Sequence, residues 1–315
     1  MKKTAILAVI LLMIGSATVW ADGIDAFSVF KTGVGARALA MGGAFVAVAD
    51  DATAVLWNPA GLAQLNDTRV AGMSTDLYGL GITHQFIGVT TSMFDLGFGL
   101  GWERASIDGQ QINLEGEPGG AFTWTENAII GSLAANVMDV AMAGANVKYY
   151  MADSGLGDAA SGFGFDLGLL VSLGDTFTIG VNAADLAGSK LSWDGGASDI
   201  ISGLYKAGFA LTLVEGQFVL AADVDFNGTD FSDAHVGMEF QLIEEFALRA
   251  GVRLTNDFQD SVISIGGGVY VAGLSVDGAY LFNKTLGNTL VLSAEFSLGS
   301  LFGDEEPVAE DVEIE

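Results

Sequence analysis

Apolar and polar side chains alternate along most of the chain from residue 69 onward. In residues 289–298, for example, Leu290 and Leu292 fall on one face, whereas Ser293 and Glu295 fall on the other. A period of two predicts β-strands with two unlike faces. Fourteen such strands are expected, near residues 69–78, 81–93, 95–105, 124–137, 139–151, 162–173, 175–185, 201–214, 217–226, 233–243, 246–254, 261–271, 274–282 and 288–299.

The connections between these strands are short and long in turn. Six are very short, at Phe94-Asp95, Met138-Asp139, Gly174-Asp175, Glu215-Gly216, Glu244-Glu245 and Ala272-Gly273. They interleave with seven that are mostly longer, around 79–81, 106–123, 152–161, 186–200, 227–232, 255–260 and 283–287. A soluble β-sandwich would also contain alternating strands, but it has no reason to order its connections in this way. The order is typical of transmembrane β-barrels, which have tight periplasmic turns and longer outer loops.

The charged residues of the predicted strands are concentrated on one face of each strand. They are Lys148, Asp166, Asp223, Asp225, Glu239, Arg249, Arg253, Asp277 and Glu295. A charge that faces lipid at the bilayer midplane costs about 2–4 kcal/mol, so a membrane would enforce this segregation. We therefore predict an all-β fold, a transmembrane antiparallel β-barrel of about fourteen strands, with these charged side chains facing its lumen.

The composition is consistent with such a barrel. Half of the residues are hydrophobic and the mean hydropathy is +0.46. After the first 21 residues, however, no stretch reaches the ~18 consecutive apolar residues that a membrane-spanning helix needs. A barrel reconciles the two observations because its apolar residues occupy alternate strand positions.

The two ends of the chain are expected to lie outside the barrel, which would comprise residues 69–302. Residues 1–21 are predicted to be a cleavable signal peptide, because Lys2 and Lys3 precede a short apolar run and Val19 and Ala21 suit a cleavage site. An uncleaved anchor helix is the alternative. Residues 303–315 are strongly acidic and are predicted to be a disordered tail.

Charge and cysteine content exclude several classes of function. The formal net charge is −27, or −29 without residues 1–21, which carry +2. Such a chain repels DNA, RNA and anionic lipid headgroups, so no nucleic-acid partner is expected. The absence of cysteine means that there is no disulfide framework and no thiolate chemistry, and it allows a periplasm-facing location.

Residues 22–68 do not alternate as one long strand. They are expected to contain Gly-rich turns, an apolar run at 45–49, and a short helix over 52–57 with Asp50 or Asp51 as its N-cap. Asn58-Pro59 would end this helix. Eight-stranded barrels are filled by their own side chains and sixteen to eighteen strands leave a water channel, so fourteen strands leave room for a plug. We predict that residues 22–68 form that plug.

The run GARALAMGGAFVAVADDATAVLWNPAGLA, from Gly35 to Ala63, resembles the N-terminal signature of the FadL/PorV superfamily of outer-membrane barrels, in wording closest to the PorV/PorQ branch. The resemblance implies a fourteen-stranded barrel with an N-terminal plug. It also implies either a route for hydrophobic molecules such as long-chain fatty acids, as in FadL, or the docking of a cargo protein in type IX secretion, as in PorV. The remaining chain matches only in pattern, and it is too short for the large outer loops and outer substrate groove of FadL.

Three motifs in this segment have both a chemical and a structural interpretation. Asp50-Asp51 could act as paired carboxylates or stabilise a helix N-terminus. Asn58-Pro59-Ala60 could bind a ligand or form a turn that seats the plug. Gly42-Gly43 could belong to a nucleotide loop or to a tight turn, and it lacks the strand–turn–helix context of the former. We favour the structural interpretation of each motif, with gating as a second role.

Catalytic and metal sites are not expected, and neither is a cofactor. His84 and His235 are too few for a cluster, and the strands contain no plausible Ser/His/Asp set. His235 should face the lumen, whereas the face of His84 is left open. Acids in the loops could bind calcium or form a solvated surface, and the second is favoured because none has the required spacing; they are Asp153/Asp158, Asp194/Asp199 and Asp223/Asp225/Asp230/Asp233.

Two main functions are therefore expected for an outer-membrane protein of a Gram-negative-type bacterium. The first is passive transport of a hydrophobic or amphipathic, fatty-acid-like small molecule. The second is a non-transporting scaffold that docks a secreted or periplasmic protein; a soluble secreted β-protein is a third interpretation. The expected partners are outer-membrane lipid and one of these two ligands. Because the strand number is even and the short connections share one side, both ends of the mature chain are predicted to be periplasmic.

Overall fold

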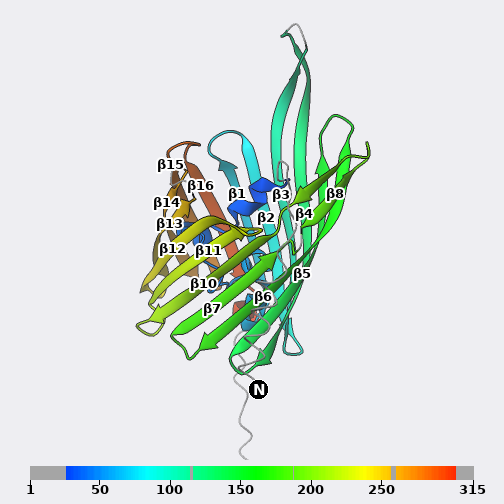
Figure 1. The fold of residues 1–315 in the computed structure, drawn as a ribbon. Helices are drawn as coiled ribbons and strands as arrows, with labels where there is room; N and C mark the ends of the chain where they lie inside the picture. Colours follow the sequence, from blue (N-terminus) through cyan, green and yellow to red (C-terminus); the bar gives the residue numbers. More distant parts are fainter. Residues whose placement is uncertain (1–25, 114–115, 187, 257–259, 303–315) are drawn as a thin grey trace, which may run out of the picture.

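The wall of the molecule is a closed antiparallel β-barrel of fourteen strands, in a computed structural model that describes residues 26–113, 116–186, 188–256 and 260–302 (Figure 1). Each strand pairs with the wall strands before and after it, and β1 pairs with β16 to close the ring. The wall strands are β1 (Arg69–Leu77), β2 (Ile82–Met93), β3 (Leu96–Ile112), β4 (Pro118–Met138), β5 (Ala141–Asp153), β6 (Ala159–Leu173), β7 (Phe177–Ala184), β10 (Leu204–Leu213), β11 (Phe218–Asn227), β12 (Asp230–Ile243), β13 (Phe246–Thr255), β14 (Val262–Val271), β15 (Leu274–Asn283) and β16 (Thr289–Ser297).

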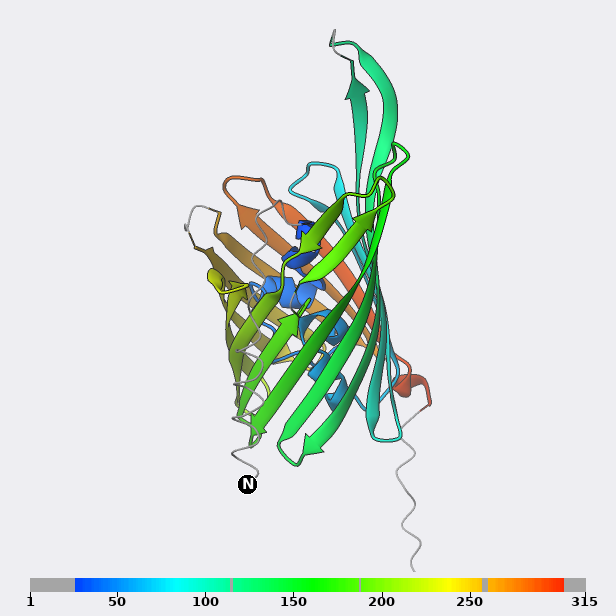
Figure 2. The same cartoon turned by 45° about the vertical axis from the view of Figure 1, so that its right-hand side comes forward.

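The prediction of fourteen barrel strands is confirmed, and most strand ends agree within a few residues. The differences lie in the longer connections. The predicted loop 106–123 is mostly a hairpin, because β3 and β4 continue to pair beyond the barrel (Figure 2). The predicted loop 186–200 contains a second hairpin of β8 (Ser189–Trp193) and β9 (Ser198–Ile201), and β8 pairs with the end of β6. In both loops, strand pairing supplies the backbone hydrogen bonds that an irregular loop would take from water.

The short connections are tight turns that suit the twist of the strands. Phe94 and Asp95 have φ values of 56° and 61°, and Ala272 and Gly273 have 49° and 80°. Two consecutive positive φ angles are the mark of a type I′ turn, which matches the right-handed twist of the strands that it joins. These turns fix the register of neighbouring strands and therefore which residues face inward.

The outer face of the wall is apolar. Large hydrophobic side chains project from it on nearly every wall strand; examples are Leu100, Ile129, Val147, Phe165, Val236, Leu248, Ile265, Val276 and Leu292. The charged residues predicted to face the lumen lie on the opposite face of the same strands, and Asp166, Asp223 and Asp277 among them are buried inside the barrel. An apolar exterior around a charged interior is the arrangement that a lipid bilayer requires.

We expect Leu292→Arg to lower the free energy of unfolding by about 2–4 kcal/mol, because Leu292 is 56% exposed on the outer face in the middle of β16. Val271→Arg is the matched control. Val271 is 60% exposed but ends β14 beside a turn, so an arginine there reaches the interface and should cost only about 0–1 kcal/mol. Denaturant titration in lipid vesicles measures both. Equal losses would contradict the placement of Leu292 at mid-membrane.

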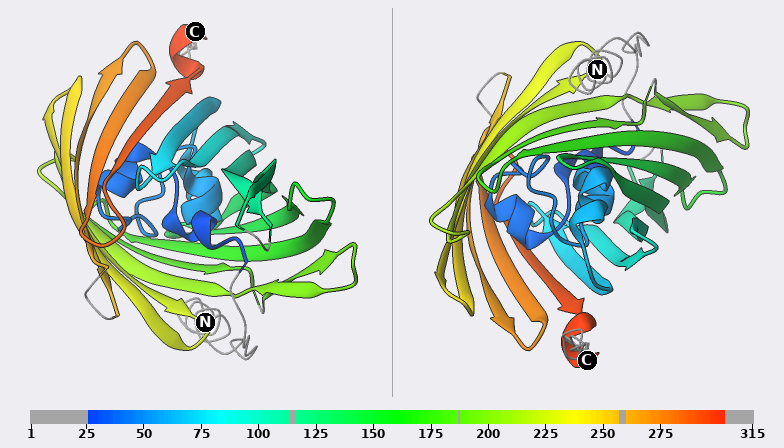
Figure 3. Two further views of the ribbon diagram at one scale, coloured as in Figure 1. Left: turned by 90° about the horizontal axis from the view of Figure 1, so that it is seen from above. Right: turned by 90° about the horizontal axis from the view of Figure 1, so that it is seen from below.

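The segment from Ala26 to Thr68 is folded inside the barrel (Figure 3). It contains η1 (Ser28–Thr32), α2 (Ala36–Ala40), α3 (Ala54–Trp57) and η2 (Pro59–Gln64). Its apolar side chains, among them Phe45, Val55 and Leu62, are buried against one another and against luminal residues such as Phe86 and Val291. We refer to residues 26–68 as the N-terminal segment.

The helix predicted over 52–57 is shorter than expected, because α3 begins at Ala54. The prediction of Asp50 or Asp51 as its N-cap is wrong, since the N-cap position is Thr53. The Asp51 carboxylate instead accepts hydrogen bonds from the amide and hydroxyl of Thr53, at 2.8 and 2.5 Å. The helix ends before Asn58-Pro59, where η2 begins.

The two described ends of the chain lie at opposite ends of the barrel. The Ala26 amide donates to the carbonyl of Ile200, in the β8–β9 hairpin on the side of the longer connections. Leu298 donates to Thr68 on the side of the short turns. Residues 22–25 lie outside the described residues, so the periplasmic location of both ends of the mature chain stays a prediction. The predicted signal peptide, 1–21, and the predicted tail, 303–315, lie outside the described residues.

None of the described helices is both long and apolar enough to cross a membrane.

Candidate functional site

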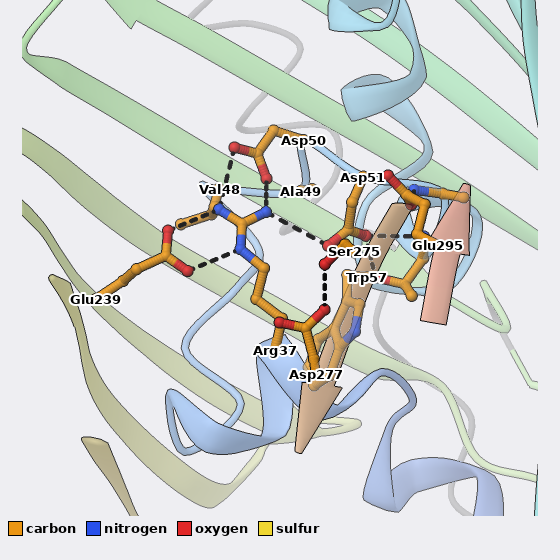
Figure 4. Close-up of polar contacts among 12 residues, drawn as sticks. Arg37, Val48, Ala49, Asp50, Asp51, Trp57, Glu239, Ser275, Asp277 and Glu295 are labelled. Atoms are coloured by element: carbon orange, nitrogen blue, oxygen red, sulfur yellow. Dashed lines mark hydrogen bonds and ion pairs between the residues drawn. The ribbon is translucent and has the colours of Figure 1, made fainter. Parts of the chain in front are cut away.

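The candidate site is the barrel lumen, where the N-terminal segment meets the polar residues of the wall. Arg37, on α2, is the centre of one contact (Figure 4). Its guanidinium holds both carboxylate oxygens of Glu239, on β12, at 2.8 and 2.9 Å. The same guanidinium donates to Asp50 at 2.5 Å and to Asp51 at 3.4 Å. One arginine therefore joins the two predicted acids to the wall by paired, charge-assisted hydrogen bonds.

The contact continues into the wall on both sides. Arg249 donates to Glu239 at 2.5 Å and to Asp277 at 2.6 Å. On the other side, Glu295 accepts from the amide of Ala52 at 2.7 Å and pairs with Arg69 at 3.2 Å. Four of the predicted luminal charges thus belong to one network around Arg37, and each has an opposite charge or a backbone donor beside it.

This network determines the charge states of Arg37 and Asp51, two buried ionisable groups of the N-terminal segment. Burial would lower the pKa of Arg37, but Asp50 and Glu239 hold it well above the ordinary value. Burial raises the pKa of Asp51, and the charge of Arg37 opposes that rise. Arg37 therefore stays cationic, and Asp51 depends on it for its ionised form.

The Asn58-Pro59-Ala60 turn rests against the wall on the opposite side of the lumen. The Asn58 amide donates to the carbonyls of Val46 at 2.8 Å and Leu169 at 3.2 Å, and its oxygen accepts from Ala60 at 3.2 Å. Wall glycines make this approach possible. A Cβ atom on Gly168 would lie 2.2 Å from Asn58 Oδ1, and one on Gly144 would lie 2.4 Å from the carbonyl carbon of Pro59.

Gly42-Gly43 forms a tight turn after α2, with φ values of 70° and 82°. A Cβ atom on Gly42 would lie 2.6 Å from the backbone nitrogen of Val252 on β13. The Gly42 carbonyl also lies 2.7 Å from Nδ1 of His235 on β12. Glycine is therefore required at residue 42 both by the backbone angle and by the closeness of the wall.

The other predicted luminal charges are also paired. The Asp223 carboxylate accepts from the amides of Phe45 and Val46 at 2.7 and 2.9 Å. The remaining pairs are Lys148 with Asp166 and Asp185, at 2.7 and 2.8 Å, Lys206 with Asp225, at 2.5 Å, and Arg253 with Asp233, at 3.9 Å. His84, whose face the sequence left open, is buried and lies 2.8 Å from Glu103.

Acids of the loops make local structural contacts. Asp153 accepts from the amide of Gly155, and Asp199 accepts from the indole of Trp193. Within the part of the chain that the structure describes, no three histidine or carboxylate residues come together as a metal site would require.

Three cavities surround the N-terminal segment. Two lie toward the longer connections. The first, of about 40 Å³, which we call the upper cavity, is lined by Lys31, His84, Lys206, His235 and Arg253 among others. The second, of about 70 Å³, the aromatic cavity, is lined by Phe27, Phe30, Trp57, Tyr150 and Asn182 among others. The two adjoin, since Lys31, Gly33, Trp57 and Lys206 line both.

The third cavity, of about 90 Å³, lies toward the short turns and is polar. Arg37, Asp51, Arg69 and Glu295 line it. No residue lines both this polar cavity and either of the others. Gly35 and Thr53 line the polar cavity, whereas Gly33 and Trp57, a few residues away in the sequence, line the other two. The N-terminal segment thus separates cavities on the two sides of the barrel.

Sequence reasoning missed Arg37 and the aromatic cavity. Arg37 had one detectable signal, because it and Lys31 are the only basic residues between positions 22 and 68. Phe27, Phe30 and Asn182 had none, because they come from two segments that are far apart in the sequence.

No known protein-family model matches the chain, and no curated protein sequence matches it. Several solved structures do resemble it. The Pseudomonas putida toluene transporter TodX is 15% identical with a TM-score of 0.61, the Ralstonia pickettii toluene transporter TbuX is 15% identical with a TM-score of 0.60, and a Pseudomonas aeruginosa FadL homologue is 14% identical with a TM-score of 0.60. Each match covers 84% of this chain and 98% of the other. The likeness shows that the fold is that of the FadL-type barrels.

Proposed function

We propose that this protein is an outer-membrane transporter through which hydrophobic or amphipathic small molecules pass without an energy source. In this proposal the N-terminal segment is a plug, and the upper and aromatic cavities receive the molecule from outside. The observation that carries the proposal is an aromatic-lined cavity inside the barrel, on one side of the segment that divides the lumen. Two of the similar structures are named as toluene transporters, which supports the same class of substrate.

The charge of the chain bears on the finer question of a fatty-acid-like substrate. The chain without residues 1–21 has a net charge of −29, which repels a carboxylate. Three basic residues and both histidines line the upper cavity, but Lys206 and Arg253 among them already pair with Asp225 and Asp233. The proposed class therefore favours neutral hydrophobic or amphipathic molecules over a charged fatty acid.

Uptake by cells tests the proposal. A Gram-negative host that lacks channels of this kind should take up radiolabelled toluene faster when it makes the protein. Ala184 lines the aromatic cavity, so Ala184→Phe should abolish most of the gain. Ala207 lies on the outer face of β10 next to Lys206, and Ala207→Phe adds the same ring to the lipid side as a control. Equal uptake with and without the protein would refute transport.

Orientation in the membrane is the subject of a separate prediction. If the longer connections face outward, an epitope inserted at Gly195-Gly196, in the exposed turn between β8 and β9, should be labelled on intact cells. The same epitope at Glu244-Glu245, in a short turn, should be labelled only after the cells are opened. Labelling of the Glu244-Glu245 insertion on intact cells would reverse the proposed orientation.

A scaffold that docks a secreted or periplasmic protein is the second candidate, and one observation favours it. Residues 108–112 of β3 and 118–124 of β4 extend beyond their pairing with β2 and β5. This hairpin stands clear of the barrel and exposes Ile112 (Figure 2). Free strand edges of this kind can bind a strand from another protein. Loss of a co-purifying protein when residues 108–122 are replaced by a short turn would support docking over transport.

A further inference from the structure

We propose that the aromatic cavity binds a neutral molecule of one aromatic ring with a hydrogen-bonding substituent, and that Asn182 recognises this substituent. The inference rests on the proposed transport function and narrows its substrate class. It would make the substrate more polar than the hydrocarbon in the names of the toluene transporters that the fold resembles.

The first observation is the state of the Asn182 side chain. Asn182 lies on the luminal face of β7, between Gly168 on β6 and Lys206 on β10. It is fully buried and lines the aromatic cavity. Neither its amide nitrogen nor its carbonyl oxygen has a hydrogen-bond partner in the protein. Buried carboxamides are rarely left unpaired on both atoms, so this group is suited to bind something that enters the cavity.

The second observation is that the neighbouring polar groups of the cavity are already engaged. Lys206 pairs with Asp225, and the Tyr150 hydroxyl lies 2.9 Å from Asp185. The ammonium of Lys148 is shared between Asp166 and Asp185, and Glu103 is held by His84. Among the buried polar side chains that line the described cavity, the carboxamide of Asn182 is the one without a partner, and it offers an NH₂ group that donates and an oxygen that accepts.

The third observation is the shape and lining of the cavity. Phe27 lies edge-to-face against both Phe30 and Tyr150, with ring centroids 5.1 and 4.9 Å apart, and Trp57 completes the aromatic lining. A volume of about 70 Å³ is about half of the ~150 Å³ cavity that binds benzene. A guest of more than one ring is therefore excluded, and a single ring must also extend into the adjoining upper cavity, of about 40 Å³. Aromatic walls favour an aromatic guest in the same edge-to-face geometry.

These observations predict an order of affinity. A hydrocarbon such as toluene fits the rings but leaves Asn182 unpaired, whereas benzamide supplies a donor and an acceptor. A site built around such hydrogen bonds discriminates against the analogue that lacks them, here by about 10- to 100-fold. Benzoate should also bind weakly, because the buried ammonium groups of Lys148 and Lys206 already have acidic partners and cannot neutralise a further carboxylate.

Binding of benzamide, toluene and benzoate to the purified full-length barrel, measured by calorimetry in detergent, tests the inference. Wild type should bind benzamide about 10- to 100-fold more tightly than either other probe. Asn182→Leu should lose that preference, because leucine keeps the volume and removes both polar atoms. Thr90→Val is the matched control: Thr90 is also buried on the lumen side without a partner, but it does not line this cavity. It should leave all three affinities unchanged.

Several outcomes would overturn the inference. The first is that the wild-type protein binds benzamide no more tightly than toluene. The Asn182 carboxamide would then form its hydrogen bonds with water and not with the guest. Another is an Asn182→Leu variant with unchanged benzamide affinity. The wild-type comparison needs no variant, so it decides even if Asn182→Leu does not fold. The uptake experiment fails independently: toluene uptake without benzamide preference refutes this inference only, and benzamide binding without uptake of any probe refutes transport only.

Discussion

Deletion of residues 26–64 is expected to raise the single-channel conductance of the barrel by at least about tenfold. Removing the N-terminal segment joins the cavities that it now separates. Fourteen strands approach the sixteen to eighteen that enclose a water-filled channel in porins. The wall should still fold, because the ladder from β1 to β16 closes without the segment. Planar-bilayer recordings measure the change.

The opened pore should also prefer cations. The deletion uncovers Asp223 and Glu239, which now bind the N-terminal segment, and removes Arg37. Replacing residues 108–122 with a short turn is the control, because it removes the part of the β3–β4 hairpin that extends beyond the wall and leaves the segment in place. If the deleted barrel folds and conducts no better than wild type, the segment does not close the lumen. Docking would then explain the protein better than transport.

The wall could be predicted from the sequence because its rules are local. A period of two, a tight turn and the exclusion of charge from one face act over a few residues. Residues such as Leu292 and Glu295 therefore reveal their faces without knowledge of the rest of the chain. The long hairpin of β3 and β4 was not predicted, since its mixed polar sequence does not differ from that of a loop.

The interior could not be predicted in the same way, because its contacts join distant residues. Arg37 and Glu239 are 202 residues apart, and Asn58 and Leu169 are 111 apart. One overlooked signal does exist. Several luminal positions are glycines at which a Cβ atom would touch the backbone of the N-terminal segment; they are Gly97, Gly144, Gly180, Gly237 and Gly251. Glycine on the inward face of a strand therefore marks where that segment rests.

Arg37→Met is expected to release the N-terminal segment while the wall stays folded. The substitution leaves the buried Asp51, beside Glu295, and the partly exposed Asp50 without their shared cation. Breaking a buried ion pair in this way costs about 3–5 kcal/mol. The loss should destabilise the N-terminal segment and not the wall, because Glu239 still pairs with Arg249 and the strand pairing does not involve Arg37. Hydrogen exchange should quicken at the amides of residues 36–62, with little change in the wall strands.

Two further variants show whether charge geometry is the cause. Lys31→Met removes the other basic residue of the segment, which lies 3.5 Å from Asn227 at an exposed contact, and should change exchange little. Arg37→Lys keeps the charge but cannot hold Glu239 and Asp50 with a planar fork, so its effect should be intermediate. If Arg37→Lys matches wild type, charge alone holds the segment. If Arg37→Met also matches it, the network does not hold the segment at all.

The effect of Arg37→Met should depend on pH in a defined direction. Burial already raises the pKa of Asp51, and losing Arg37 removes the charge that opposes the rise. A carboxyl with a raised pKa in the folded state is stabilising when protonated, so the segment of the variant should be held best at low pH. Its stability should fall as pH rises from about 4, the ordinary value for aspartate, through the raised pKa. The exchange rates of the variant are corrected for the intrinsic rate. If exchange then slows as pH rises, the unpaired Asp51 carboxylate is not what releases the segment.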